Sequence, residues 1–146
     1  MLQRLQSIFL ALAGASLFGT FGLPFAETTA PVSASELFAD TEYTVQDNIG
    51  LIIIFALAGL LAIGGVFLFR NRPLQIRVSI FAFIATLIGL ILGAVFFMQD
   101  SVRLGDAAVD DGFGIYLPVL GGALLLFAIR YIRKDEKLVR SADRLR

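Results

Sequence analysis

Four long apolar stretches divide the chain, and none of them contains Asp, Glu, Lys or Arg. A helix needs roughly 20 residues to cross about 30 Å of hydrocarbon. Because a backbone inside lipid must satisfy its own hydrogen bonds, such stretches predict helices rather than strands. The pattern therefore predicts four transmembrane helices, at about residues 5–23, 49–69, 78–98 and 113–129.

Charge is distributed unevenly over the segments between these stretches. Eleven of the twelve Lys and Arg residues lie in the N-terminus, in residues 70–77 and in residues 130–146. Nine of the twelve Asp and Glu residues lie in residues 24–48 and 99–112. Because Lys and Arg mark the cytoplasmic side of a membrane protein, we expect both termini in the cytoplasm, a cytoplasmic loop 70–77, a basic helical cytoplasmic tail 130–146, and external loops 24–48 and 99–112.

The expected fold class is all-α: a polytopic membrane protein in which residues 1–146 form one domain, with four transmembrane helices in an up-down bundle. An apolar fraction of 58% and a mean hydropathy of +0.84 exceed those of an ordinary soluble domain. The first stretch also resembles a secretory signal, and its removal after about residues 26–30 is the alternative. Pro24 and Pro31 disfavour those cleavage positions, and cleavage would leave three spans in the same orientation.

The composition also limits the chemistry that the chain can perform. It has no Cys, no His and no Trp. Without His or Cys it lacks the usual proton shuttle, the commonest metal ligand and a strong nucleophile–base pair. No Gly-rich phosphate loop follows a strand. No ionisable Asp, Glu, Lys, Arg or His lies inside a span, where an ion-coupled carrier would usually have one. We therefore expect no enzyme activity, no metal and no cofactor.

Small residues recur every three or four positions in each predicted span, which lets helix backbones approach closely in lipid. We favour packing inside the bundle as their role, and a face for a homo-oligomer is the alternative. The four sets are Ser7, Ala11, Ala15 and Gly19; Ala58, Ala62 and Gly65; Ala85, Gly89 and Gly93; and Gly114, Pro118 and Gly122.

Acidic and polar residues precede two of the predicted helices on the external side. Asp47 and Asn48 precede the second helix, and Asp110 and Asp111 precede the fourth. We expect them to cap free N–H groups and to meet the positive end of the helix dipole. A cation site among the acids of loop 99–112 is the alternative, but they lack the spacing of a calcium loop.

The first external loop has two weak local signals. Ser33 and Glu36 have the spacing of a capping box, which predicts a short helical turn near residues 37–38. Apolar and polar residues alternate around Tyr43, which predicts a short extended segment.

The C-terminal tail is expected to continue the fourth helix, with Glu136 and Arg140 spaced for a favourable ion pair. Such a basic helix suits anionic lipid head groups or a soluble protein partner. Its charges are too mixed to favour nucleic acid, and no nucleic-acid binding is expected. A narrow apolar stripe among the basic residues consists of Ile132, Leu138, Val139, Ala142 and Leu145.

Three segments together carry a resemblance: MLQRLQSIFLALA at residues 1–13, FRNRPLQIR at 69–77 and RYIRKDEKLVRSADRLR at 130–146. Over essentially its whole length the chain resembles a family of uncharacterised four-span inner-membrane proteins of Bacteroidota-type bacteria. The resemblance implies a multi-pass protein of the bacterial inner (cytoplasmic) membrane, and it implies no activity. The family's polar signature corresponds to Gln3, Arg4, Gln6, Asn71, Arg72, Gln75, Arg77, Arg130, Lys134, Asp135, Glu136, Arg140, Ser141, Asp143 and Arg144.

The expected function is that of a non-enzymatic accessory or scaffold subunit with a basic cytoplasmic face. Its partners would be the lipid bilayer and a cytoplasmic or membrane protein. The alternative is a small carrier or lipid-handling protein that uses the bundle interior. The candidate cytoplasmic interaction surface consists of Gln3, Arg4, Gln6, Arg70, Asn71, Arg72, Gln75, Arg77, Arg130, Arg133, Lys134, Asp135, Glu136, Lys137, Arg140, Ser141, Asp143, Arg144 and Arg146.

Overall fold

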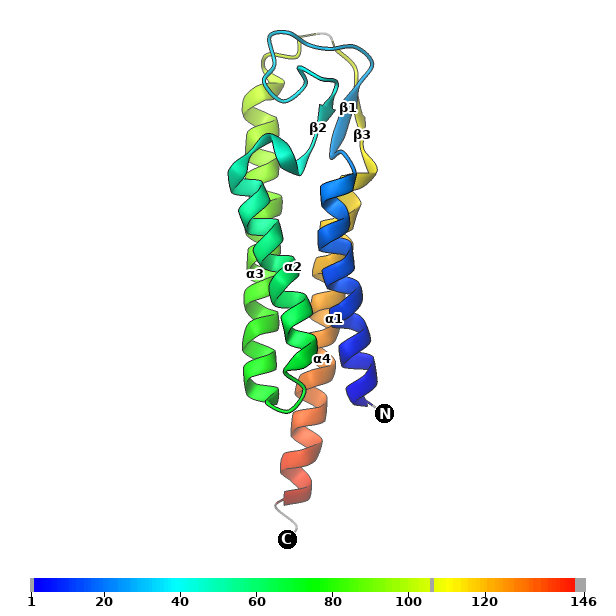
Figure 1. Cartoon of the computed structure of the whole chain (residues 1–146), viewed down its shortest axis with the longest axis vertical. Helices are drawn as coiled ribbons and strands as arrows, with labels where there is room; N and C mark the ends of the chain where they lie inside the picture. The colour runs from blue at the N-terminus through cyan, green and yellow to red at the C-terminus, as the bar shows by residue number, and fades with distance from the viewer. Residues whose placement is uncertain (1, 106, 144–146) are drawn as a thin grey trace.

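Four long helices and a small sheet make up the computed structural model, which describes residues 2–105 and 107–143 (Figure 1). The helices are α1 (Leu2–Gly19), α2 (Ile49–Phe67), α3 (Arg72–Ser101) and α4 (Tyr116–Asp143). Three single turns of 3₁₀ helix are η1 (Thr20–Gly22), η2 (Val45–Asp47) and η3 (Phe113–Ile115). The strands are β1 (Ala26–Thr28), β2 (Glu42–Tyr43) and β3 (Val109–Asp111).

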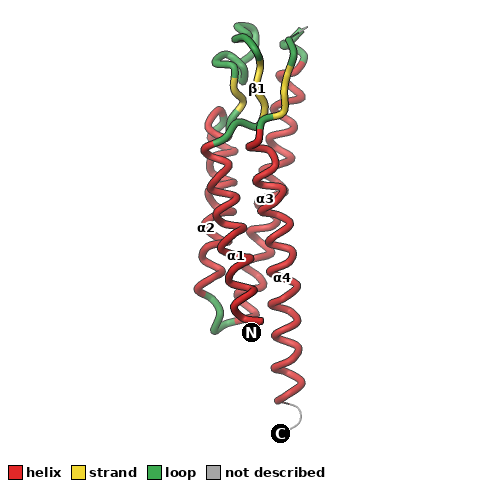
Figure 2. Tube along the Cα trace, turned by 90° about the vertical axis from the view of Figure 1, so that its right-hand side faces the viewer, coloured by secondary structure: helices red, strands yellow, loops and turns green. Residues whose placement is uncertain are grey.

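The four helices lie side by side, and the chain reverses direction from each helix to the next (Figures 1 and 2). α1 packs against α2 and α4, and α3 packs against the same two helices. The start of α1, the α2–α3 connection and the last turns of α4 lie at one end, which we call the basic end. The three strands lie at the opposite end, which we call the cap end.

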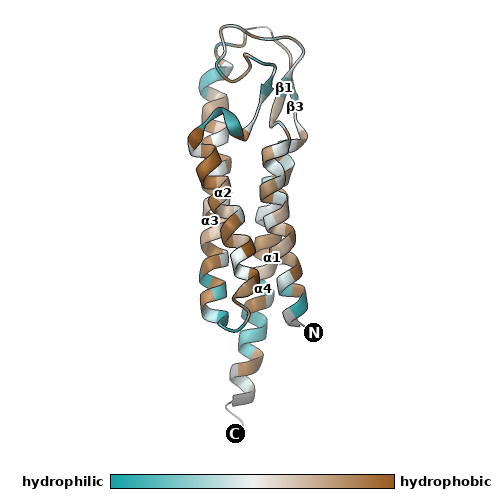
Figure 3. Ribbon diagram, viewed as in Figure 1, coloured by the Kyte–Doolittle hydropathy of each residue, from teal (hydrophilic) through white to brown (hydrophobic). Residues whose placement is uncertain are grey.

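All four helices are long and apolar enough to cross a membrane. Figure 3 shows hydrophobic residues concentrated between the two ends of the molecule and hydrophilic residues on the last turns of α4. Many large apolar side chains on the helices are exposed, as expected for a surface that lipid would cover. The four helices therefore correspond to the four apolar stretches predicted from the sequence.

α3 begins earlier than expected, and the loop predicted at residues 70–77 is mostly helical. Asn71 Oδ1 accepts a hydrogen bond from the Leu74 N–H at 3.2 Å, which caps the helix. Pro73 lies in the first turn, where its missing N–H costs little. The connection between α2 and α3 is therefore only residues 68–71.

Small residues lie where the helices approach most closely. The predicted sets of the second, third and fourth spans are all buried. A Cβ added to Gly89 would lie 2.7 Å from a ring atom of Phe55, so α3 can approach α2 here only because residue 89 is glycine. The packing prediction is wrong for the α1 set, because Ala11 and Ala15 are exposed. The buried residues of α1 are instead Gln6, Leu10, Ala13, Gly14, Ser16 and Leu17.

The cap end contains a three-stranded antiparallel sheet in the order β2-β1-β3, which the all-α prediction did not include. β1 follows η1 after three residues and forms the centre of the sheet. Ala26 lies opposite Tyr43 on one side and opposite Asp111 on the other. The extended segment predicted around Tyr43 is confirmed by β2. The sheet joins the two connecting segments that were predicted as separate loops.

Only one of the two predicted pairs of helix caps is present. Asn48 Oδ1 accepts a hydrogen bond from the Gly50 N–H at 2.8 Å and caps α2, while Asp47 completes a capping box with Thr44 at η2. Asp110 and Asp111 do not cap α4, because both lie in β3.

The helical turn predicted near residues 37–38 is also wrong. Residues 36–38 form a bend, and no helix is assigned there. The physical reason is a long-range contact: the backbone N–H of Leu37 donates to the carboxylate of Asp100, in the last turn of α3. This contact replaces the local hydrogen bonds that a helical turn would need.

Candidate functional site at the basic end

Two glutamines of the candidate surface are buried between helices. Gln6 is 1% exposed and Gln75 is 0% exposed. Gln6 Nε2 donates to the carbonyl oxygen of Tyr131 at 3.4 Å, which links α1 to α4. Gln75 Nε2 donates to the carbonyl oxygen of Gly65 at 2.9 Å, which links α3 to α2. Both were predicted to be surface residues, and the structure corrects this.

The reason is helical periodicity. Gln6 lies four residues before Leu10, and Gln75 lies four residues before Ser79, so each glutamine shares the inward face of its helix. Burial leaves Gln75 Oε1 without a hydrogen-bond partner among the described residues. An unpaired acceptor in a helix interface costs about 1–3 kcal/mol, so this amide is only half satisfied by the contact with α2.

Three more residues of the candidate surface hold the basic end together. Arg72 Nε lies 2.9 Å from Asp135 Oδ2, and this ion pair joins the start of α3 to α4. Both side chains are mostly buried, which protects the pair from solvent screening. Asn71 caps α3 immediately before Arg72. These side chains fix the position of α4 relative to α3.

The remaining basic side chains of this region point outward. Arg130, Arg133, Lys134 and Lys137 of α4 are exposed, and so is Arg77 of α3. They border two shallow grooves. The α3–α4 groove, of about 400 Å³, is lined by Pro73, Ile76, Arg77, Arg133, Glu136 and Lys137. The outer α4 groove, of about 450 Å³, is lined by Leu126, Ile129, Arg130, Arg133, Lys134 and Lys137.

Two further arginines lie around the same end. Arg4 is exposed and lines a groove of about 440 Å³ with Ser7, Ile8 and Phe69, between α1 and the α2–α3 connection. The guanidinium carbon of Arg70 lies 5.9 Å from the ring centroid of Phe69, within the range of a cation–π contact. Arg70 is itself exposed.

The last residues of the candidate surface are described only in part. Ser141 is exposed, and its hydroxyl donates to the carbonyl oxygen of Leu138 at 2.8 Å. Gln3, Arg140 and Asp143 lie in helices, but the structure describes only their backbone. The remaining two, Arg144 and Arg146, lie outside the described residues.

The apolar stripe predicted on the tail is interrupted. Ile132 is buried against the other helices and belongs to the core. Leu138 and Val139 are 53% and 38% exposed, on the part of α4 that extends past the start of α3. Exposed apolar residues on the tail are therefore confined, among the described side chains, to one turn.

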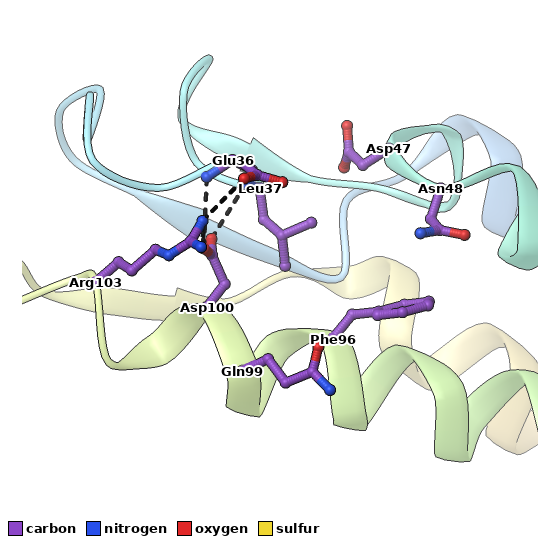
Figure 4. Close-up of a pocket in the computed structure, with 8 residues that line it drawn as sticks. All are labelled: Glu36, Leu37, Asp47, Asn48, Phe96, Gln99, Asp100 and Arg103. Carbon is purple, nitrogen blue, oxygen red and sulfur yellow. Dashed lines mark hydrogen bonds and ion pairs between the residues drawn. The ribbon is translucent and has the colours of Figure 1, made fainter.

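A second polar cluster lies at the cap end, and the sequence did not indicate it (Figure 4). Asp100 is 6% exposed. Its carboxylate accepts hydrogen bonds from the Ser35 hydroxyl, from the Leu37 N–H at 3.1 Å and from the Glu36 N–H at 3.4 Å. Arg103 Nη1 lies 3.5 Å from Asp100 Oδ1 and 3.0 Å from Glu36 Oε1. The cluster fastens the segment before β2 to α3 and borders a pocket of about 180 Å³.

An apolar pocket of about 190 Å³ lies between the sheet and α3. Phe25, Tyr43 and Phe97 line it, and Tyr43 and Phe97 stack with their ring centroids 6.4 Å apart.

Among the described residues, no group of three or more His, Cys, Asp or Glu is placed to hold a metal ion.

A family model for a domain of unknown function, DUF4293, matches residues 2–145. The chain belongs to the DUF4293 family. The match confirms membership of an uncharacterised family over nearly the whole chain. No curated protein and no solved structure matches it.

In this DUF4293 chain, the polar residues that carried the resemblance have two different roles. Gln6, Asn71, Arg72, Gln75 and Asp135 join or cap helices. A second set remains exposed around the basic end and is available to contact something else: Arg4, Arg77, Arg130 and Lys134. A functional surface at this end would therefore involve exposed side chains and not the whole signature.

Proposed function

We propose that this DUF4293 protein is a non-enzymatic, multi-pass protein of the bacterial inner membrane that acts as an accessory or scaffold subunit. Its basic end would face the cytoplasm, because Lys and Arg in short connections favour that side. Its cap end carries most of the carboxylates and would face outward. The four apolar helices support insertion, and the charge distribution supports the orientation.

The observation that carries the proposal is the projection of α4 beyond the other three helices (Figure 1). Asp135 contacts the first residue of α3, and α4 continues to Asp143. On this projecting segment Leu138 and Val139 are exposed beside basic residues. A short helix without tertiary contacts is only marginally stable in water. A partner that covered Leu138 and Val139 would stabilise the projecting segment and bury its apolar turn.

The interior of the helices gives little support to the carrier alternative. Where α2 meets α3, the ring of Phe55 lies directly against Gly89, and the ring of Phe25 packs on it with the two ring centroids 6.0 Å apart. Ala58, Ala62 and Ala85 are all between 0% and 5% exposed. Such close contact leaves no room for a substrate in this part of the interior, and a transport path there would require the helices to separate.

Site-specific photo-crosslinking in native membranes tests the scaffold proposal. A photoreactive residue at Val139 should give one stoichiometric protein adduct, and the same residue at Val102, which is 86% exposed at the cap end, should not. Leu138→Asp should abolish the adduct from position 139, because it places a charge on the apolar turn. Recovery of lipid adducts alone, or of the same adduct from both positions, would contradict a docked partner.

Orientation needs a separate measurement. A reporter that is active only in the cytoplasm should work when fused after Arg146 and fail when inserted at Ala34, which is exposed in the segment between β1 and β2. The reverse pattern would overturn the orientation while leaving the helix assignment intact.

A further inference from the structure

Two exposed cations of α4, Arg133 and Lys137, would lie near the depth where a membrane changes from hydrocarbon to head groups. Tyr116 begins α4 at the cap end, and tyrosine favours the membrane interface. At 1.5 Å per residue, Arg133 lies about 26 Å along the helix from Tyr116 and Lys137 about 32 Å. The hydrocarbon core is about 30 Å thick. Once inserted, α4 would therefore place Arg133 and Lys137 on either side of the boundary with the phosphates.

Both grooves at this depth combine an apolar floor with a cationic rim. Pro73 and Ile76 form the apolar part of the α3–α4 groove, and Arg77 adds a cation from the neighbouring helix. In the outer α4 groove the apolar part comes from Leu126 and Ile129, and Arg130 and Lys134 add the cations. This combination matches the head-group end of a phospholipid, where the phosphate lies next to the apolar chains.

The two grooves are adjacent because they share Arg133 and Lys137. Glu136 is the one carboxylate that lines either groove. Asp135, which lies next to it in sequence, is already paired with Arg72 at 2.9 Å. The grooves therefore keep a strong net positive charge and suit two phosphates held a short distance apart.

We propose that these grooves together bind one phospholipid with two phosphates, a diphosphatidylglycerol. One phosphate lies between Arg77 and the shared pair Arg133 and Lys137, and the other lies between the same pair and Arg130. Its acyl chains follow the apolar floors toward the middle of the membrane. Basic pockets beside transmembrane helices on the cytoplasmic side are known to favour such head groups. The proposal rests on the proposed membrane insertion and not on a protein partner at Leu138.

Lipid binding to the full chain in a mild detergent tests the proposal by native mass spectrometry. The probes are diphosphatidylglycerol, phosphatidylglycerol at an equal concentration of phosphate, and phosphatidylcholine. We expect one diphosphatidylglycerol per chain, retained at least tenfold more tightly than phosphatidylglycerol, and no retained phosphatidylcholine. Equal retention of the two anionic lipids would overturn the two-phosphate site.

A matched pair of double variants locates the site. Arg133→Gln with Lys137→Gln should reduce the affinity for diphosphatidylglycerol at least tenfold. Arg4→Gln with Arg70→Gln removes the same charge from exposed positions at the same end. This variant should change the affinity for diphosphatidylglycerol less than twofold. An equal loss in both variants would mean diffuse attraction by charge and would overturn the site.

Two further measurements keep the result interpretable. Arg77→Gln with Arg130→Gln removes one cation from each groove and leaves the shared pair intact. It should give a smaller loss of affinity than Arg133→Gln with Lys137→Gln. It replaces that variant as the test of the site if that variant folds poorly. Solubility of the chain without detergent would contradict membrane insertion and the proposed function with it. Detergent-dependent, helical protein that shows no preference for diphosphatidylglycerol would contradict only the lipid site.

Discussion

The Tyr43 hydroxyl donates a hydrogen bond to the carbonyl oxygen of Gly93, 2.9 Å away, and joins strand β2 to α3. Burial raises the pKa of the Tyr43 phenol above its ordinary value, and the nearby charge of Asp47 raises it further. The phenol therefore remains protonated in the folded protein at pH values where an exposed tyrosine would lose its proton. One hydroxyl thus connects the sheet to the helices.

Tyr43→Phe should lower the free energy of unfolding by about 0.5–1.5 kcal/mol near neutral pH, because it removes this hydrogen bond. The folded-state pKa of Tyr43 lies above the unfolded value of about 10. The contribution of Tyr43 is therefore complete below about pH 10 and is lost as the pH rises toward the folded-state pKa. Thermal unfolding in detergent between pH 8 and 11 should show a steeper alkaline loss for the native chain than for Tyr43→Phe. Tyr116→Phe, at an exposed position, is the control and should keep the native slope.

Asp100→Ala should release the segment before β2 from α3. The substitution leaves the Ser35 hydroxyl and two backbone N–H groups without their acceptor, and the expected loss in the free energy of unfolding is about 2–3 kcal/mol. Hydrogen exchange of residues 35–38 should become fast, while exchange in α2 stays slow. Asp110→Ala removes an exposed carboxylate of β3, also at the cap end, and should have little effect. Unchanged protection of residues 35–38 would show that the Asp100 cluster does not hold the segment.

Gly89→Ala should be destabilising by about 1–3 kcal/mol, because the added Cβ would lie 2.7 Å from the Phe55 ring and overpack the α2–α3 contact. Gly122→Ala is a matched control, since its nearest side-chain atoms would be 3.8 Å away. At Gly122 the better helix propensity of alanine should leave stability unchanged or slightly higher. Unfolding by denaturing detergent, followed by circular dichroism, measures both variants. Equal stability of the two would contradict close α2–α3 packing.

Gln75→Met should change the free energy of unfolding by less than about 1 kcal/mol. Methionine fills nearly the same volume and removes an amide whose oxygen has no partner among the described residues. The Gly65 carbonyl that Gln75 contacts still accepts from the Leu68 N–H at 3.3 Å. Gln75→Ala leaves a cavity instead and should cost more than Gln75→Met. A loss of 2 kcal/mol or more in the methionine variant would show that both ends of the amide are bonded.

The intact mass of the purified protein should include residues 1–30. Leu10, Ala13 and Leu17 of α1 are 0% exposed. Cleavage after Ala26 or Ala30 would remove these core residues, and cleavage after Ala30 would also remove the central strand of the sheet. A mass that lacks this segment, in a protein that remains folded, would contradict the packing of α1 in the core.

The sequence predicts the positions of the four helices well, because charge-free runs of about 20 residues are a strong signal. It also contains a signal for the buried side of two helices. Gln6, Leu10, Ala13 and Leu17 follow each other at spacings of four, three and four, and the same spacing runs from Gln75 through Ser79 and Ala82 to Thr86. A polar residue in such a series lies on the buried face of its helix, as Gln6 does near the start of the span 5–23 and Gln75 does just before the span 78–98.

The sheet and the Asp100 cluster could not be predicted in the same way. Only β2 lies in a segment with an alternating pattern, and β1 and β3, of three residues each, are too short to show one. Their pairing depends on contacts between segments far apart in sequence, such as Ala26 with Asp111. Asp100 follows directly after an apolar stretch and has the position expected of a boundary residue. Only the folded structure brings Ser35 to it.

The central place of β1 in the sheet has a consequence for how the protein is made. β1 leaves the ribosome among the first thirty residues, but its partner β3 is synthesised only after α3 is complete. The sheet therefore stays open through most of translation. It can close only shortly before α4, which starts a few residues after β3. A closed sheet thus requires that the chain has been made at least as far as β3, and until then the edge of β1 that faces β3 has no partner strand.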